Sequence, residues 1–224
     1  MKTLGWLECL FIALLIPVGA VAGALTGIVV LGPVFAVCIP LAVASAFLRL
    51  RGERWRQLNL FQRLPWKETI GWTIGAIVSA LVLSNIVVTP LLKQLGVPPT
   101  NVSALVSLIE GDLTYYLLFL FPVAWGSAAV GEELLVRGYL LYRMETLSNT
   151  WIAVILQALI FSLAHLYQGW MGVINIFVLA LVFGIVFVRS GRSLWPLIVA
   201  HGLIDTVAIT LIYIGRSDLL IGAS

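Results

Sequence analysis

Three charged residues lie inside an otherwise apolar stretch of the chain. The segment GEELLVRG, residues 131–138, holds Glu132, Glu133 and Arg137. Helical spacing puts Glu133 and Arg137 at i and i+4, on one face, where they neutralise each other and support a site structurally. Glu132 points about 100° away and has no partner in its own helix. A purely structural cluster of the three would leave one carboxylate in surplus, so Glu132 is our first candidate for a functional role.

The chain contains two histidines, and both fall within segments that we expect to be membrane helices. His165 ends the segment FSLAH, and His201 begins HGLID. Asp205 follows His201 at i+4, so the two side chains can converge on one atom. A single buried histidine is more often a satisfied core residue. Two histidines, together with an aspartate at ligand spacing and a surplus glutamate, favour a site.

The four residues of this candidate catalytic set suit the hydrolysis of a peptide bond. Hydrolysis needs a water made nucleophilic and a place for the developing oxyanion, and no Ser or Cys lies in a recognisable nucleophile motif. We expect Glu132 to be the general base and His165 to hold the water or a metal. We expect His201 to stabilise the oxyanion or bind the same metal, with Asp205 orienting it.

The same residues, His165, His201, Asp205 and Glu132, form a candidate ligand set for a divalent metal. Zinc binds histidine nitrogen and carboxylate oxygen and commonly leaves one position open in enzymes, so we expect zinc before manganese or iron. A metal-independent mechanism remains an alternative. An ionised Asp205 cannot donate a hydrogen bond to an oxyanion, which favours the metal.

Composition identifies the elements that must position these residues. The 224 residues are 61% hydrophobic and 10% charged, with a mean hydropathy of +1.09. This balance excludes an ordinary soluble domain and predicts an all-α polytopic transmembrane bundle. No loop is long enough for a folded soluble module. We therefore expect a single integral domain with the lipid bilayer as its surroundings.

The apolar segments predict about seven membrane-spanning helices. An N-terminal hairpin with its turn near Gly27, Gly32 and Pro33 is followed by five further spans, because 43 consecutive apolar residues exceed one span. The expected segments are 6–48 for the hairpin, then 69–89, 113–142, 150–167, 170–188 and 194–213. Residues 1–68 would form the hairpin and a basic interfacial segment, and residues 69–224 the transmembrane catalytic core.

The basic residues predict the orientation. Seven spans place ten Lys and Arg residues on the side of the N-terminus and leave Lys93 and Arg216 on the other. The positive-inside rule then makes the N-terminus cytoplasmic and the C-terminus external. The basic and aromatic segment 53–68 is typical of contact with anionic headgroups, so we expect no nucleic-acid partner. We also expect the first helix to be retained rather than cleaved as a signal peptide, because Glu8 interrupts its start.

Taken in order, three motifs resemble one family of intramembrane proteases. They are Glu132-Glu133-x-x-x-Arg137, Phe161-x-x-x-His165 and His201-x-x-x-Asp205. The pattern is similar to the CPBP family, which comprises CAAX prenyl proteases and the Abi, or bacteriocin-processing, proteins. The resemblance covers about residues 113–210. It implies an all-helical membrane endopeptidase in which Glu132 and His165 activate a water. Many members have Asn at the last position, where this chain has Asp205.

The resemblance implies a peptide or membrane-protein substrate that is lipidated or membrane-associated, and prenylated in the eukaryotic branch. Short loops and small size favour a bacterial plasma membrane. Two alternatives use the same buried polar residues: a non-catalytic immunity or scaffold protein, and a transporter of protons or small solutes. The chain has no second half resembling the first, which argues against a transporter built on repeats.

Overall fold

The computed structural model describes residues 2–220, and every regular element in that range is helical. Six helices there are apolar and long enough to cross a membrane, which confirms the polytopic bundle. Four of them are α1 (Lys2–Ala24), α2 (Leu31–Leu50), α9 (Gly169–Arg189) and α10 (Trp195–Tyr213). The other two are composite. One joins α3 (Trp66–Leu81), η2 (Val82–Val88) and α4 (Thr89–Gln94), and the other joins α6 (Leu113–Leu118), η3 (Phe119–Glu132), η4 (Leu134–Leu141) and α7 (Tyr142–Glu145).

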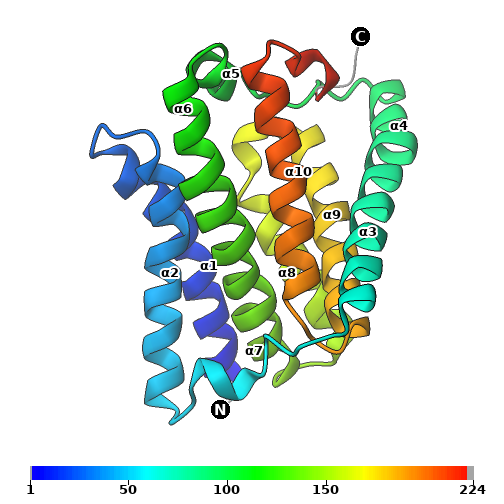
Figure 1. The fold of residues 1–224 in the computed structure, drawn as a ribbon. Helices are drawn as coiled ribbons and strands as arrows, with labels where there is room; N and C mark the ends of the chain where they lie inside the picture. Colours follow the sequence, from blue (N-terminus) through cyan, green and yellow to red (C-terminus); the bar gives the residue numbers. More distant parts are fainter. Residues whose placement is uncertain (1, 221–224) are drawn as a thin grey trace.

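The helices stand side by side, and the bundle has two distinct ends (Figure 1). Helix α1 begins at the lower end of the view, and α10 finishes at the upper end. The segment from α2 to α3, which contains the short helix η1 (Trp55–Leu58), runs across the lower end. The short helices α5 (Ser103–Ile109) and η6 (Ser217–Leu219) lie at the upper end. The loops with most of the basic residues therefore share the end where α1 begins.

The N-terminal hairpin turns where the glycines indicated. Helix α1 ends at Ala24, α2 begins at Leu31, and Gly27 between them has a φ of +75°. Gly19 and Gly23 allow the two helices to touch, because a Cβ added there would lie 2.3 Å from Phe35 O and 2.1 Å from Leu31 O. Small residues permit this close approach between helices in membranes.

The long helix that carries GEELLVRG departs from a regular α-helix. From Phe119 to Glu132 and again from Leu134 to Leu141 its hydrogen bonds follow the wider i→i+5 pattern, which is rare and often found at functional sites. Pro122 lies in this stretch and has no N–H to donate to the helix ladder. The expectation of ordinary α-helical spacing through residues 113–142 was therefore wrong, although Glu133 and Arg137 still meet.

Helix α8 (Thr150–Leu163) is shorter than the expected span of residues 150–167. The chain turns at Ala164, passes through η5 (Leu166–Gln168) and enters α9, so His165 follows a helix rather than lying inside one. Its backbone is satisfied locally, since His165 N–H donates to Ser162 O and Asn101 N–H donates to Gln168 O. Non-helical backbone at membrane depth persists only where it is buried in protein or lines a cavity.

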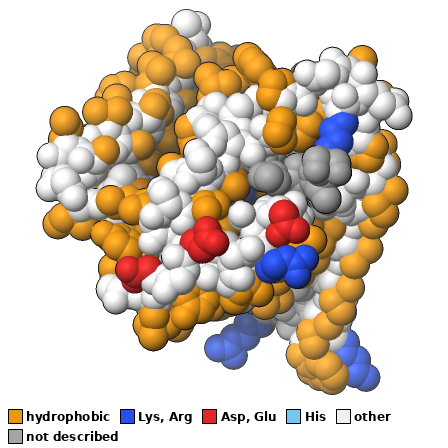
Figure 2. All heavy atoms as spheres, turned by 90° about the horizontal axis from the view of Figure 1, so that it is seen from above, with side chains coloured by type: hydrophobic (Ala, Val, Ile, Leu, Met, Phe, Trp, Pro, Cys, Tyr) orange, Lys and Arg blue, Asp and Glu red, His pale blue; other side chains and the backbone are white. Residues whose placement is uncertain are grey.

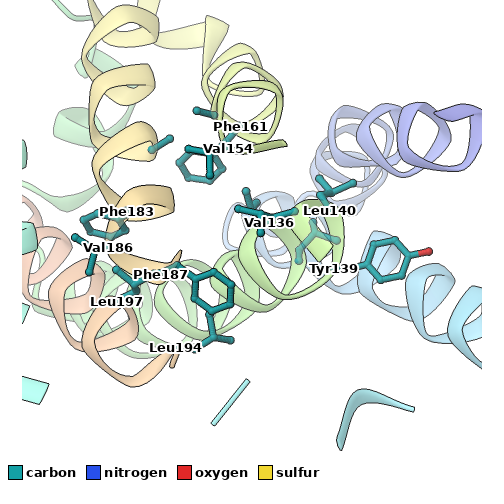
Figure 3. Close-up of a cluster of buried hydrophobic side chains, with 14 of the residues drawn as sticks. Val136, Tyr139, Leu140, Val154, Phe161, Phe183, Val186, Phe187, Leu194 and Leu197 are labelled. Carbon is teal, nitrogen blue, oxygen red and sulfur yellow. The ribbon is translucent and has the colours of Figure 1, made fainter. Parts of the chain in front are cut away.

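The core lies where η4 packs against α8, α9 and the start of α10 (Figure 3). Val136 and Leu140 of η4, Phe161 of α8 and Phe187 of α9 are among its buried side chains. By contrast, large hydrophobic side chains cover the flanks of the molecule, with a few charged groups at the upper end (Figure 2). An apolar exterior around a packed core is what a bilayer requires.

Candidate active site

A cavity of about 650 Å³ inside the bundle contains all four candidate catalytic residues in its lining. Glu132 is the last residue of η3, His201 and Asp205 lie one turn apart on α10, and His165 lies in the turn after α8. Most other lining residues are apolar. The structure therefore brings residues of all three sequence motifs to one cavity.

His201 is the centre of the cluster. Its Nδ1 donates a hydrogen bond of 3.0 Å to Glu133 Oε1, since an ionised carboxylate only accepts. Its Nε2 lies 3.8 Å from Glu132 Oε2 and 3.7 Å from Asp205 Oδ2. His201 is 7% exposed, so these neighbours rather than solvent define its surroundings. Glu132 thus meets a histidine of another helix, as its surplus charge suggested.

Glu133 and Arg137 form the ion pair expected from their spacing, at 2.9 Å and fully buried. Arg137 Nη2 also donates to Ala180 O, and the guanidinium lies between the rings of Phe161 and Phe183, 5.2 and 5.4 Å from their centroids. One oxygen, Glu133 Oε1, accepts from both Arg137 and His201. Glu133 therefore supports the helix and also orients the histidine, a second contact that the sequence did not indicate.

His165 is held by its own helix end. Its Nδ1 donates to Phe161 O at 2.9 Å, because a carbonyl only accepts, and this leaves Nε2 as the lone-pair nitrogen of the neutral ring. The centroid of the His165 ring lies 4.8 Å from that of the Phe161 ring and 5.9 Å from that of the Tyr167 ring. Both residues of the motif Phe161-x-x-x-His165 therefore act together, the phenylalanine supplying the carbonyl and the packing surface.

The donor types in this cluster suit zinc, and the distances between the donor atoms are wider than those around a bound zinc ion. Zinc bonds of about 2.0 Å in a tetrahedron place neighbouring ligand atoms about 3.3 Å apart. The two carboxylate oxygens nearest His201 Nε2 are both farther away, at 3.7 and 3.8 Å. Within residues 2–220, no three His, Cys, Asp or Glu side chains are grouped so as to hold a metal ion. The steps derived below therefore use the side chains of the chain alone.

Close packing of η3 against α10 sets the distance between the two carboxylate-bearing helices. A Cβ added to Gly202 would lie 2.6 Å from the Trp125 ring, so glycine is the residue that admits this ring. Trp125 Nε1 donates to Thr206 Oγ1 at 3.1 Å and fixes the ring against α10. Gly131, beside Glu132, similarly admits Val37 of α2, whose Cγ1 would be 2.5 Å from an added Cβ.

The sequence did not predict several residues near the site. Trp125 and Gly202 had no signal, because their contact joins positions far apart in the chain. Gln157 is fully buried and donates to Ala180 O, the carbonyl that Arg137 also uses. Ser84 and Asn85 line the cavity. These three are polar residues within apolar spans, which is the signal that could have found them.

Comparison with known families agrees with this geometry. Residues 114–207 match the model of a family described as type II CAAX prenyl endopeptidase Rce1-like. This segment is an Rce1-like domain. It contains all three motifs and confirms the family expected from them. No curated protein and no solved structure matches the chain. The Rce1-like domain and the six apolar helices identify an integral membrane protein with a domain of a protease family.

Proposed function

We propose that this protein is an intramembrane endopeptidase that hydrolyses a peptide bond with a water activated by Glu132. The observation that carries the proposal is the convergence of Glu132 and Asp205 on His201 Nε2, at 3.8 and 3.7 Å, in the wall of a cavity that His165 also lines. An inert bundle gains little from such a cluster, because each charge in it must be desolvated. The Rce1-like domain supports the same class of reaction.

In the proposed reaction, Glu132 removes a proton from water as the water oxygen bonds to the substrate carbonyl carbon. The carbonyl becomes an oxyanion, which a ring N–H of His165 or His201 stabilises when that ring is protonated. Glu132 then gives its proton to the amide nitrogen as the C–N bond breaks, which releases a carboxylic acid and an amine. Glu133 keeps His201 oriented, and Asp205 Oδ2 lies 3.7 Å from Nε2.

Cleavage by the purified protein tests the proposal. Wild type and Glu132→Gln, reconstituted in liposomes, are incubated with membrane-associated peptides, including a prenylated CAAX peptide and its unprenylated twin, and the products are identified by mass spectrometry. We expect wild type to cut at one bond and Glu132→Gln to be slower by about 10²-fold or more, since general-base catalysis contributes that much. Equal cleavage by both proteins, or none by either, would count against an endopeptidase and favour an immunity, scaffold or transport role.

We keep a divalent metal, with zinc first, as a prediction from the donor types. Elemental analysis of the purified wild type beside His165→Ala and His201→Ala tests it. Stoichiometric metal in wild type and its loss from both variants would support a metalloprotease. An active wild type without metal would support the metal-independent mechanism.

Substrate and setting follow from the same proposal. A membrane-associated peptide matches the family and the cavity's position among the apolar helices of the bundle. We further propose that this peptide is prenylated. Comparing cleavage of the prenylated CAAX peptide with that of its unprenylated twin tests this proposal. We also propose a cytoplasmic N-terminus, because the basic loops share the end where α1 begins. The short loops and small size are the basis for proposing a bacterial plasma membrane.

A further inference from the structure

The cavity has a group of polar residues outside the catalytic cluster. Ser84 and Asn85 of η2 and Asn175 of α9 line the same cavity as Glu132. We refer to these three residues as the polar strip. Their neighbours Val82, Leu83, Ile86 and Val87 on η2 are exposed and apolar, as a lipid-facing surface should be. Ser84 is half-buried and Asn85 is exposed, and both belong to the cavity lining.

The strip has hydrogen-bonding capacity that the protein does not use. Asn175 Nδ2 donates to Thr89 Oγ1 at 3.0 Å, but Asn175 Oδ1 is buried and has no partner. Asn85 Nδ2 donates to Leu81 O at 3.1 Å, which leaves its Oδ1 available. Leaving a buried acceptor unpaired is energetically unfavourable. A membrane helix that keeps one beside a reactive site has a reason to do so.

A peptide substrate needs such groups. A bond presented to Glu132 must lie in a segment that has left its helix, and its backbone N–H and C=O groups then have no partners of their own. Inside a bilayer each unsatisfied backbone group is strongly unfavourable, because no water is present to pair with it. Amide oxygens of asparagine accept from a backbone N–H, and a serine hydroxyl donates to a backbone C=O.

We propose that Ser84, Asn85 and Asn175 bind the main chain of the extended peptide segment next to the scissile bond. This inference rests on the endopeptidase function and names the conformation of the substrate that the site accepts. Asn175 provides the best-defined contact, because its bond to Thr89 fixes the Nδ2 end of the amide and leaves the oxygen for the substrate. The Asn175 side chain is half-buried and lines the cavity.

Single ester replacements in a cleaved peptide test the contact. Each peptide has one backbone N–H near the scissile bond replaced by oxygen, which removes one donor. In wild type we expect one position to raise KM by about fivefold, the equivalent of one hydrogen bond of about 1 kcal/mol. In Asn175→Leu the all-amide peptide should show a similar rise in KM, and the ester at that position should have no further effect.

Matched variants separate this contact from a structural effect. Ser84→Ala should raise KM, whereas Ser79→Ala, the same change on an exposed position outside the cavity lining, should not. Thr73→Val removes a comparable bond between helices, Thr73 Oγ1 to Pro196 O, away from the cavity, and should leave the ester pattern unchanged. The proposal would be overturned if the ester raised KM in Asn175→Leu by the same factor as in wild type. It would also be overturned if KM stayed within twofold of wild type in both Asn175→Leu and Ser84→Ala.

Binding to Glu132→Gln distinguishes this inference from the proposed function. Anisotropy of a fluorescent peptide reports binding without cleavage. If the ester pattern appears in binding while wild type cuts no peptide, the strip binds peptide and the endopeptidase function fails. If wild type cuts peptides and no ester replacement weakens cleavage or binding, the proposed role of the polar strip is wrong and the endopeptidase function stands. If neither cleavage nor binding is seen, both fail.

Discussion

At the scale of single residues, His201 and Glu133 decide how the site is organised. Glu133 Oε1 accepts from Arg137 and from His201, so one carboxylate oxygen joins a buried cation to the histidine that faces Glu132. The order of the two glutamates matters for this reason. Glu132 lines the cavity, and Glu133 is fully buried behind it. The two adjacent glutamates therefore have different roles: Glu132 is placed to act on substrate, and Glu133 positions His201.

Changing Glu133 should affect turnover more than substrate binding. Glu133→Asp keeps the charge that balances Arg137 but withdraws the carboxylate from His201 by about one methylene, and Glu133→Gln also leaves Arg137 as an unpaired buried charge. We expect kcat to fall by about 10² or more in both, with KM within about threefold, because a misoriented histidine impairs the reaction rather than peptide binding. The measurement is steady-state cleavage, with thermal unfolding in detergent recorded beside it. A folded Glu133→Asp with wild-type kcat would contradict this role.

The sequence revealed much of this residue-scale arrangement but not its central contact. Spacing of four residues predicted the pair Glu133 and Arg137 and put His201 with Asp205, because i,i+4 neighbours meet on any helix. The bond between Glu133 and His201 joins positions 68 residues apart. No local rule gives such a contact, since it depends on how two helices pack.

At the scale of elements, packing between η3 and α10 holds the catalytic groups at their separation. Apolar periodicity could predict that these two helices exist, but not that a tryptophan ring lies on a glycine between them. The same limit applies to α8. A continuous apolar run predicted a full span, whereas the helix ends at Leu163 and the turn with His165 completes the cavity wall. Non-helical backbone is tolerated where it lines a cavity. The cavity forms between helices that are distant in the chain, so the local sequence does not reveal it.

Gly202→Ala tests whether this packing sets the site geometry. The new methyl group would lie 2.6 Å from a rigid ring, so α10 or Trp125 must shift and His201 moves with it. We expect cleavage to fall by about tenfold or more, because small displacements of catalytic groups are costly. Gly71→Ala is the matched control. It adds a methyl to α3 where no atom lies within 4 Å, and alanine favours a helix over glycine by up to about 1 kcal/mol. Equal activities of the two variants would show that the contact between Gly202 and Trp125 does not set the geometry of the site.

At the scale of the whole molecule, the N-terminal hairpin is joined to the domain that holds the site. Glu8 of α1 pairs with Arg51 at 2.5 Å and with Arg143 at 3.2 Å, and it accepts a hydrogen bond from Tyr139 of η4. Cys9 and Ile12 are buried in the same core as η4. A helix with these contacts is part of the folded bundle. Glu8 was the residue that argued against a signal peptide, and its partners explain its presence.

The two ends of the bundle should face different compartments, and single cysteines can show which is which. Arg56 of η1 and Asp218 of η6 are exposed at opposite ends. In a Cys9→Ala, Cys38→Ala background, we expect a membrane-impermeant maleimide to label Asp218→Cys in intact cells and Arg56→Cys only after lysis, because loops rich in Lys and Arg stay cytoplasmic. Labelling of both positions after lysis is the control for accessibility. The reverse pattern in intact cells would invert the topology and place the basic loops outside. It would leave the geometry around His201 unchanged, so peptide cleavage in detergent should not depend on the answer.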